Sequence, residues 1–150
     1  MKQFTVELKD IEPRPIVMLK NFFGLDAMLD TGSLFPIWVD DERILKEIGG
    51  VLEGVNKPFG GFGGMTTGNL YRIPTFQLGD LIYPNFSILA SPHKLPCQML
   101  LSATMFSRMM YEVDDQNHRL HVTVPDTESL IRNLRIEDQN GRLHIFCTSD

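Results

Sequence analysis

A single carboxylate stands where this sequence could support acid–base chemistry. Asp30 lies within the stretch AMLDTGSLFPIWV, residues 27–39. Because an ionised carboxylate is costly to remove from water, an apolar segment normally excludes Asp unless it has partners or a use. Gly32 permits a tight turn, and the hydroxyls of Thr31 and Ser33 are able to hold the carboxylate oxygens by hydrogen bonds. Since Asp before a small-residue bend is also a common turn former, the motif alone leaves both interpretations open.

Other reactive motifs are not supported by the sequence. Aspartate-nucleophile phosphatases carry a second acid two residues on, but that position is Gly32. The glycine-rich stretch GGFGGMTTG, residues 60–68, has no following Lys-Ser or Lys-Thr and so is not a P-loop. Cys97 lies in no recognisable nucleophile motif. On a strand, His118 and His121 would point to opposite faces, so we expect no metal site.

Composition and charge narrow the class of protein. The chain has 150 residues, 43% hydrophobic and 22% charged, which is typical of one folded globular domain. A net charge of -5 argues against a nucleic-acid partner. No apolar run approaches the ~20 residues that cross a bilayer, so we expect no membrane partner. The first ten residues, MKQFTVELKD, contain acids where a signal peptide would be apolar. With two cysteines making no disulfide framework, we expect a cytoplasmic protein.

Short apolar and β-branched runs alternate with turn signals along the chain, which predicts a mostly β domain with many hairpins. Two stretches are predicted to be helical. Residues 40–48 open with acids and end at Gly49-Gly50, and residues 102–110 open with a Ser N-cap. The segment after Pro125 is predicted to add a helix or strand and then a hairpin around DQNG.

The order of these features resembles the retropepsin-like (retroviral-type) aspartic proteases from about residue 17 to residue 124. Three stretches carry the resemblance: VMLKNFFGLDAMLDTGS, PFGGFGGMTTGNLYRI and CQMLLSATMFSRMMYEVDDQNHRLHV. The resemblance implies an all-β, single-lobe, closed β-barrel of the acid-protease type with one or two short helices. It also implies a protease domain over residues 1–125 and an extension, residues 126–150, that packs on the domain or on a dimer partner.

The activity implied by the resemblance is an aspartic endopeptidase that uses no cofactor. Aspartic proteolysis needs two carboxylates that share one proton, so that one acts as base towards water and the other as acid towards the peptide carbonyl. The chain has one Asp-Thr-Gly motif, and 150 residues cannot supply two lobes. The second carboxylate is therefore expected from Asp30 of a second copy, in a symmetric homodimer that binds an extended peptide or protein substrate.

The resemblance also assigns roles around Asp30. Thr31 would brace the paired turns across the two-fold axis, the Gly32 amide would orient the carboxylate, and Ser33 would hydrogen-bond its outer oxygen. A flap would close over the substrate and exclude water. Its tip is expected at Phe62, Gly63, Gly64, Met65 and Thr66.

One residue departs from the family pattern. Ser102 stands in MLLSATMF where the family has glycine beside the catalytic turn. Together with the unusual flap, it motivates an alternative, a catalytically inactive member of this fold that serves as a dimerisation or peptide-binding module. A third interpretation is a small all-β domain in which Asp30 only forms a turn.

Overall fold

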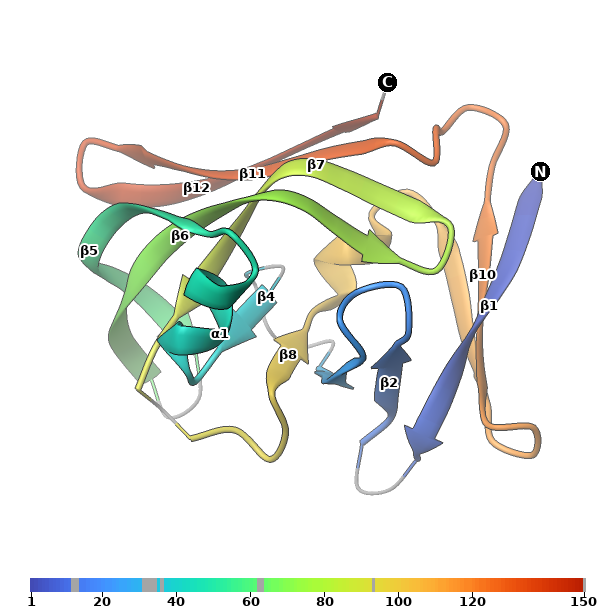
Figure 1. Ribbon diagram of the computed structural model, residues 1–150. Helices are drawn as coiled ribbons and strands as arrows, with labels where there is room; N and C mark the ends of the chain where they lie inside the picture. The colour runs from blue at the N-terminus through green and yellow to red at the C-terminus, as the bar shows by residue number, and fades with distance from the viewer. Residues whose placement is uncertain (12–13, 31–34, 36, 62–63, 93, 150) are drawn as a thin grey trace.

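The protein consists mainly of β-strands, as the sequence predicts (Figure 1). The structure, a computed structural model, describes residues 1–11, 14–30, 35, 37–61, 64–92 and 94–149, of which 59–61, 64–66 and 147–149 are described by their backbone alone. Its elements are β1 (Lys2–Asp10), β2 (Ile16–Leu19), β3 (Leu25–Leu29), β4 (Ile37–Val39), α1 (Glu42–Glu47), β5 (Val51–Gly61), β6 (Gly64–Leu78), β7 (Leu81–Ala90), β8 (Met99–Leu101), the 3-10 helix η1 (Ala103–Phe106), β9 (Met110–Asp114), β10 (Arg119–Val124), β11 (Arg132–Gln139) and β12 (Arg142–Ser149).

Ten strands pair into one sheet in the order β5-β6-β7-β4-β8-β3-β2-β1-β10-β9, and β11 and β12 form a separate two-stranded sheet. The all-β class is therefore confirmed, but within the described residues the large sheet is open rather than a closed barrel. Its edge strands, β5 and β9, do not pair with each other. The edge strand β5 instead packs against β12 of the C-terminal hairpin.

The helix α1 confirms the prediction for residues 40–48, with tighter bounds. Asp41 caps it, because its carboxylate accepts a hydrogen bond of 3.0 Å from the Arg43 backbone N–H. The helix ends where Gly49 takes a φ of +87°, a conformation that favours glycine.

The helix expected over residues 102–110 is only partly present. Ser102 caps η1 as predicted, since its hydroxyl accepts a 3.2 Å hydrogen bond from the Thr104 N–H. The helix stops at Phe106 because Ser107 is extended and Arg108 has a φ of +63°, which is incompatible with a helix. Met110 already begins strand β9.

The turn signals place the hairpins correctly. Gly79, with a φ of +57°, lies in the turn between β6 and β7. Asn140 and Gly141 both have positive φ, 55° and 82°, in the turn between β11 and β12. Two successive residues of positive φ suit a tight hairpin turn and explain the choice of Asn-Gly. The final hairpin around DQNG is therefore confirmed.

The hairpin of β11 and β12, named here the C-terminal hairpin, lies along β7 at the top of Figure 1, and its turn reaches the side occupied by β5. A parallel bridge joins Ile82 of β7 to Ile131 just before β11, and the Ile82 N–H donates a 2.9 Å hydrogen bond to the Leu130 carbonyl. The division into a domain of residues 1–125 and an extension of residues 126–150 stays a prediction.

Candidate active site

Asp30 directly follows the buried strand β3. Its backbone N–H donates a 2.8 Å hydrogen bond to the Leu101 carbonyl of β8, which extends the parallel pairing of the two strands by one step. The side chain is 14% exposed, and its Oδ1 lies 3.6 Å from Nη1 of Arg14. A carboxylate is thus held at a strand end, largely shielded from water, with a cation beside it.

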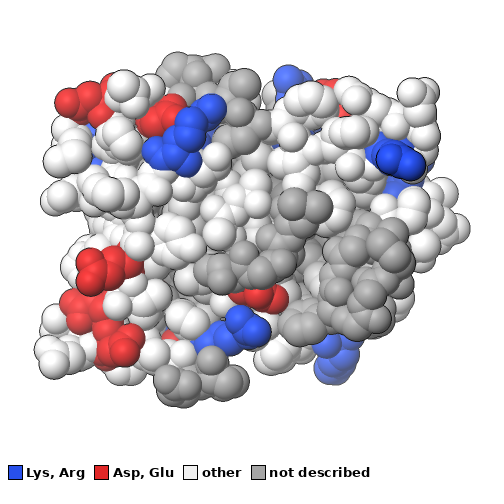
Figure 2. Space-filling view, turned by 180° about the vertical axis from the view of Figure 1, so that it is seen from behind, with Lys and Arg blue, Asp and Glu red and all other residues white. Residues whose placement is uncertain are grey.

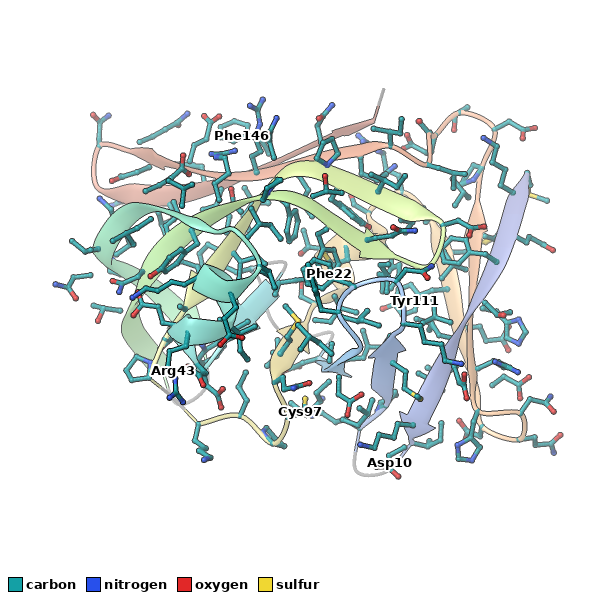
Figure 3. The ribbon with its side chains drawn as sticks, in the orientation of Figure 1. Asp10, Phe22, Arg43, Cys97, Tyr111 and Phe146 are labelled. Carbon is teal, nitrogen blue, oxygen red and sulfur yellow. The ribbon has the colours of Figure 1, made fainter. Side chains whose placement is uncertain are left out.

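Asp30 lies on the same face of the sheet as an open pocket. Alternation along β3 puts Asp26, Met28 and Asp30 on one side. Asp26 and Met28 line a pocket of about 490 Å³, together with Lys9, Asp10, Arg14, Ile16, Gly24, Pro96, Cys97 and Gln98. Arg14, which contacts Asp30, therefore connects the carboxylate to this pocket. Cys97 and Asp10, which both line this pocket, lie at the lower side of the molecule in Figure 3.

Cys97 lines the pocket but is poorly suited to act as a nucleophile there. Burial raises the pKa of its thiol, which is half-buried. The thiol donates a 3.0 Å hydrogen bond to the Met99 carbonyl. Because the reactive form of cysteine is the thiolate, burial makes Cys97 less reactive at neutral pH than an exposed thiol.

An apolar row crosses the sheet on the face that carries Asp30. Each residue in it is the register partner of the next on the adjacent strand. From β2 to β6 the row consists of Ile16, Met28, Leu100, Trp38, Leu89 and Leu70. The flanking residues, such as Leu29 and Leu101, face the main core on the opposite side. The apolar row therefore forms a continuous buried layer next to Asp30, in which every member from Met28 to Leu70 is at most 4% exposed.

Ser102 is fully buried beside this site. Its hydroxyl caps η1, so the polar group that replaces the expected glycine is used locally. The preceding residue, Leu101, supplies the carbonyl that binds the Asp30 N–H. The substitution thus leaves the backbone link between β8 and Asp30 in place.

The glycine-rich segment forms the far end of the β5–β6 hairpin. The backbone register pairs Gly61 with Gly64, Gly60 with Met65 and Phe59 with Thr66. Phe62 and Gly63 lie outside the described residues, so the role of this hairpin as a flap stays a prediction. Thr31, Gly32 and Ser33 also lie outside the described residues, and their roles beside Asp30 stay predictions.

A polar cluster, not anticipated from the sequence, holds the base of the β5–β6 hairpin. The Tyr71 hydroxyl and the Asn69 amide, the latter at 2.8 Å, both donate hydrogen bonds to Oε1 of Glu42. These bonds lower the pKa of Glu42, while burial and the Glu42 carboxylate raise the pKa of Tyr71 to about 12. The cluster therefore ties β6 to the first turn of α1. Its residues are separated by 27 and 29 positions, so no local pattern reveals them.

Arg14 is the other site residue that the sequence did not single out. It precedes β2, whose antiparallel pairing with β3 brings the two segments together.

A different use of an acid is seen at Asp40, after β4, where Oδ2 accepts a 2.7 Å hydrogen bond from the Leu95 backbone N–H. Asp40 thus fixes a loop, as expected of a structural carboxylate.

Seen from behind, the described surface has small, separate groups of acidic and basic side chains (Figure 2). Within the described part of the chain, no group of three or more His, Cys, Asp or Glu residues is placed to hold a metal ion. Over the same residues, no helix has the length and apolar character needed to cross a membrane.

Comparison with solved structures identifies a similar fold. The structure is similar to the crystal structure of a retropepsin-like aspartic protease from Rickettsia conorii, with a TM-score of 0.56 and 13% sequence identity. The similarity covers 81% of this chain and 89% of that protein. No protein-family model and no curated protein matches the sequence. The similarity therefore shows a retropepsin-like fold.

Proposed function

We propose that this protein is an aspartic endopeptidase that acts as a homodimer. Asp30 from each of two copies forms the catalytic dyad. One carboxylate takes a proton from the attacking water, and the other donates a proton to the developing oxyanion. The substrate is an extended peptide or protein segment, which lies beside the two Asp30 carboxylates beneath the β5–β6 hairpin acting as a flap.

The placement of Asp30 carries this proposal. A largely buried carboxylate at the end of β3, anchored through its backbone to β8, stands near an open pocket in a retropepsin-like fold. Arg14 is 48% exposed and so is free to leave the carboxylate when a second copy approaches. Without such a movement, its guanidinium would compete with the partner's carboxylate for the same oxygen.

Replacement of the carboxylate tests the proposal directly. For Asp30→Asn we expect the rate of peptide cleavage to fall by at least about 10²–10⁴-fold, the usual contribution of a general acid or base. Folding and dimerisation, measured by urea unfolding and sedimentation, should persist. Asp26→Asn is the matched control, because Asp26 lies two residues earlier on the same face and pairs with Lys9 at 3.0 Å.

Three results would contradict the proposal. The first is equal cleavage by Asp30→Asn and the wild-type protein. The second is no cleavage by the wild-type protein over a wide range of pH and peptides. The third is a monomer at high concentration in sedimentation, which excludes a dyad shared between two copies.

A binding module without catalysis is the second candidate function. Ser102 in place of glycine and the Arg14–Asp30 ion pair both favour it. A module of this kind would dimerise or retain extended peptides in a pull-down while cleaving none. In that case Asp30→Asn would leave peptide binding unchanged.

A further inference from the structure

A second pocket, polar in character, lies where strands β4 and β7 end. The two strands are parallel, and the Ser91 N–H continues their pairing by donating a 2.9 Å hydrogen bond to the Val39 carbonyl. Asp40 and Ser91, the residues that follow the two strands, therefore lie at the same edge of the sheet. Asn69 of β6 is the register partner of Ala90, the residue before Ser91, so it lies at this edge as well.

This polar pocket is lined mainly by side chains that carry oxygen. They belong to Asp40, Glu42, Asn56, Thr67, Asn69 and Ser91. Two of them are acidic, and none of the described lining residues is basic. The volume is about 260 Å³, which leaves room for an ion together with several water molecules. The composition of the lining therefore favours a positively charged ligand.

The two carboxylates are each held in place through one oxygen. Oδ2 of Asp40 accepts the hydrogen bond from the Leu95 N–H. Oε1 of Glu42 accepts hydrogen bonds from Tyr71 and Asn69, which lower the pKa of Glu42 and keep it ionised at neutral pH. The other oxygen of each carboxylate makes no hydrogen bond within the described part of the chain. Two positioned carboxylates thus keep lone pairs for a ligand.

The hydroxyl of Ser91 indicates a ligand independently of the acidic residues. Ser91 lines the polar pocket and is 3% exposed. Among the described residues, its Oγ finds no hydrogen-bond partner. Buried hydroxyl groups normally have one, and an exception calls for an explanation such as a bound water or ion. A cation in the pocket supplies this partner and uses the carboxylate oxygens at the same time.

We propose that the polar pocket is a binding site for Ca²⁺, formed by the carboxylates of Asp40 and Glu42 and the hydroxyl of Ser91. Ca²⁺ binds oxygen ligands in flexible geometry and completes its shell with carbonyls and water, whereas Mg²⁺ demands a near-ideal octahedron. The described side chains offer oxygen rather than the imidazole or thiolate groups that suit zinc and copper. With only two carboxylates the affinity is low, with a Kd of about 10⁻⁴–10⁻³ M.

The calcium site is separate from the candidate active site. Within the sheet, β3 runs parallel to β8 and β4 runs antiparallel to it. Asp30 after β3 and Asp40 after β4 therefore lie at opposite ends of these strands. Bound calcium joins the ends of β4 and β7 to the first turn of α1, so its role is to stabilise the fold. The calcium site does not depend on the proposed endopeptidase activity.

A calcium chloride titration of the full-length, ¹⁵N-labelled protein tests the site. Amide chemical shifts are recorded at constant ionic strength, and magnesium chloride is titrated in parallel. For the wild-type protein we expect saturating shifts at Asp40, Glu42 and Ser91, with a Kd of about 10⁻⁴–10⁻³ M for calcium. Magnesium should bind more weakly. Shifts that do not saturate, or equal affinities for the two ions, would overturn the proposal.

Two variants remove ligands from the site. Asp40→Asn removes a charge but keeps an oxygen that can accept the Leu95 N–H, and Ser91→Ala removes the hydroxyl. We expect each to raise the Kd by about tenfold or more, because loss of even a residue that supports a metal ligand weakens binding by about 10–100-fold. An unchanged Kd in both variants would place the ion elsewhere and contradict the proposal.

Three controls match these changes and should keep the wild-type Kd. Asp41→Asn removes a neighbouring charge but retains a good N-cap for α1. Ser87→Ala removes another buried hydroxyl that lacks a partner among the described residues, from the middle of β7. Asp30→Asn removes the candidate catalytic carboxylate. Equal weakening in Asp41→Asn would indicate a general charge effect, and loss of binding in Asp30→Asn would move calcium to the candidate active site. Either result would refute the assignment.

Thermal unfolding is the second measurement. A ligand that binds only the folded protein stabilises it, so calcium at about ten times its Kd should raise the Tm by about 3–6 °C. Asp41→Asn should show the same rise, and Asp40→Asn should show little or none. An equal rise in Asp40→Asn would count against the site. If calcium binds as expected but the wild-type protein cleaves no peptide, the calcium site stands and the endopeptidase proposal fails.

Discussion

Two arginine–carboxylate pairs in this protein have the same chemistry and different construction. Arg14 and Asp30 are 3.6 Å apart, with the arginine half exposed. Arg132 and Glu128 are 3.7 Å apart, but Arg132 is fully buried and also donates a hydrogen bond to Ser107. Charge pairing contributes little where water reaches it, whereas breaking a buried pair leaves an uncompensated charge.

This difference separates a movable pair from a fixed one. Arg14 can leave Asp30 at a smaller cost, because its half-exposed guanidinium regains water when the pair separates. Arg132 is fully buried, so separation from Glu128 would leave its charge uncompensated inside the protein. The candidate catalytic carboxylate is therefore paired reversibly, while the buried pair holds the C-terminal hairpin to the segment after η1.

The largest effect is expected at the buried pair. Glu128→Gln removes the charge opposite Arg132, and we expect the free energy of unfolding to fall by about 3–5 kcal/mol. Urea unfolding measures this change. Glu137→Gln, the same substitution on the outward face of β11, is the control and should be nearly neutral. A loss below about 1 kcal/mol for Glu128→Gln would show that the two pairs are equivalent.

A smaller effect is expected at the movable pair. Arg14→Gln should lower the free energy of unfolding by less than about 1 kcal/mol, because the guanidinium is already hydrated. The same urea unfolding experiment measures it, alongside Glu128→Gln. A loss of about 3 kcal/mol or more would equal the loss expected when a buried ion pair is broken. Arg14 would then be a permanent structural partner of Asp30.

The sequence predicts local features of this fold better than distant ones. The turn at Asn140-Gly141 and the N-terminal ends of α1 and η1 depend on a few neighbouring residues, and each was placed correctly. The length of η1 was wrong, because apolar spacing does not reveal the positive φ of Arg108.

The site could be predicted only at its centre. Asp30 was found because an acid in an apolar segment needs an explanation. Arg14, the apolar row and the packing of Ile136 against that row depend on strand register and on packing between segments far apart in the chain. A pattern of period two shows which residues share a face but not which strands become neighbours.

The smallest effect is expected at Ser102, one residue after the carbonyl that anchors Asp30. Because glycine is nearly as good an N-cap as serine, Ser102→Gly should lower the free energy of unfolding by only a few tenths of a kcal/mol. Ser102→Ala, which also removes the hydroxyl but caps poorly, should cost about 1 kcal/mol. Urea unfolding of the two variants side by side makes the measurement. If Ser102→Gly lowers the free energy of unfolding more than Ser102→Ala does, Ser102 has a role beyond capping. The region beside Asp30 then tolerates substitution less well than the exposed Arg14–Asp30 pair implies.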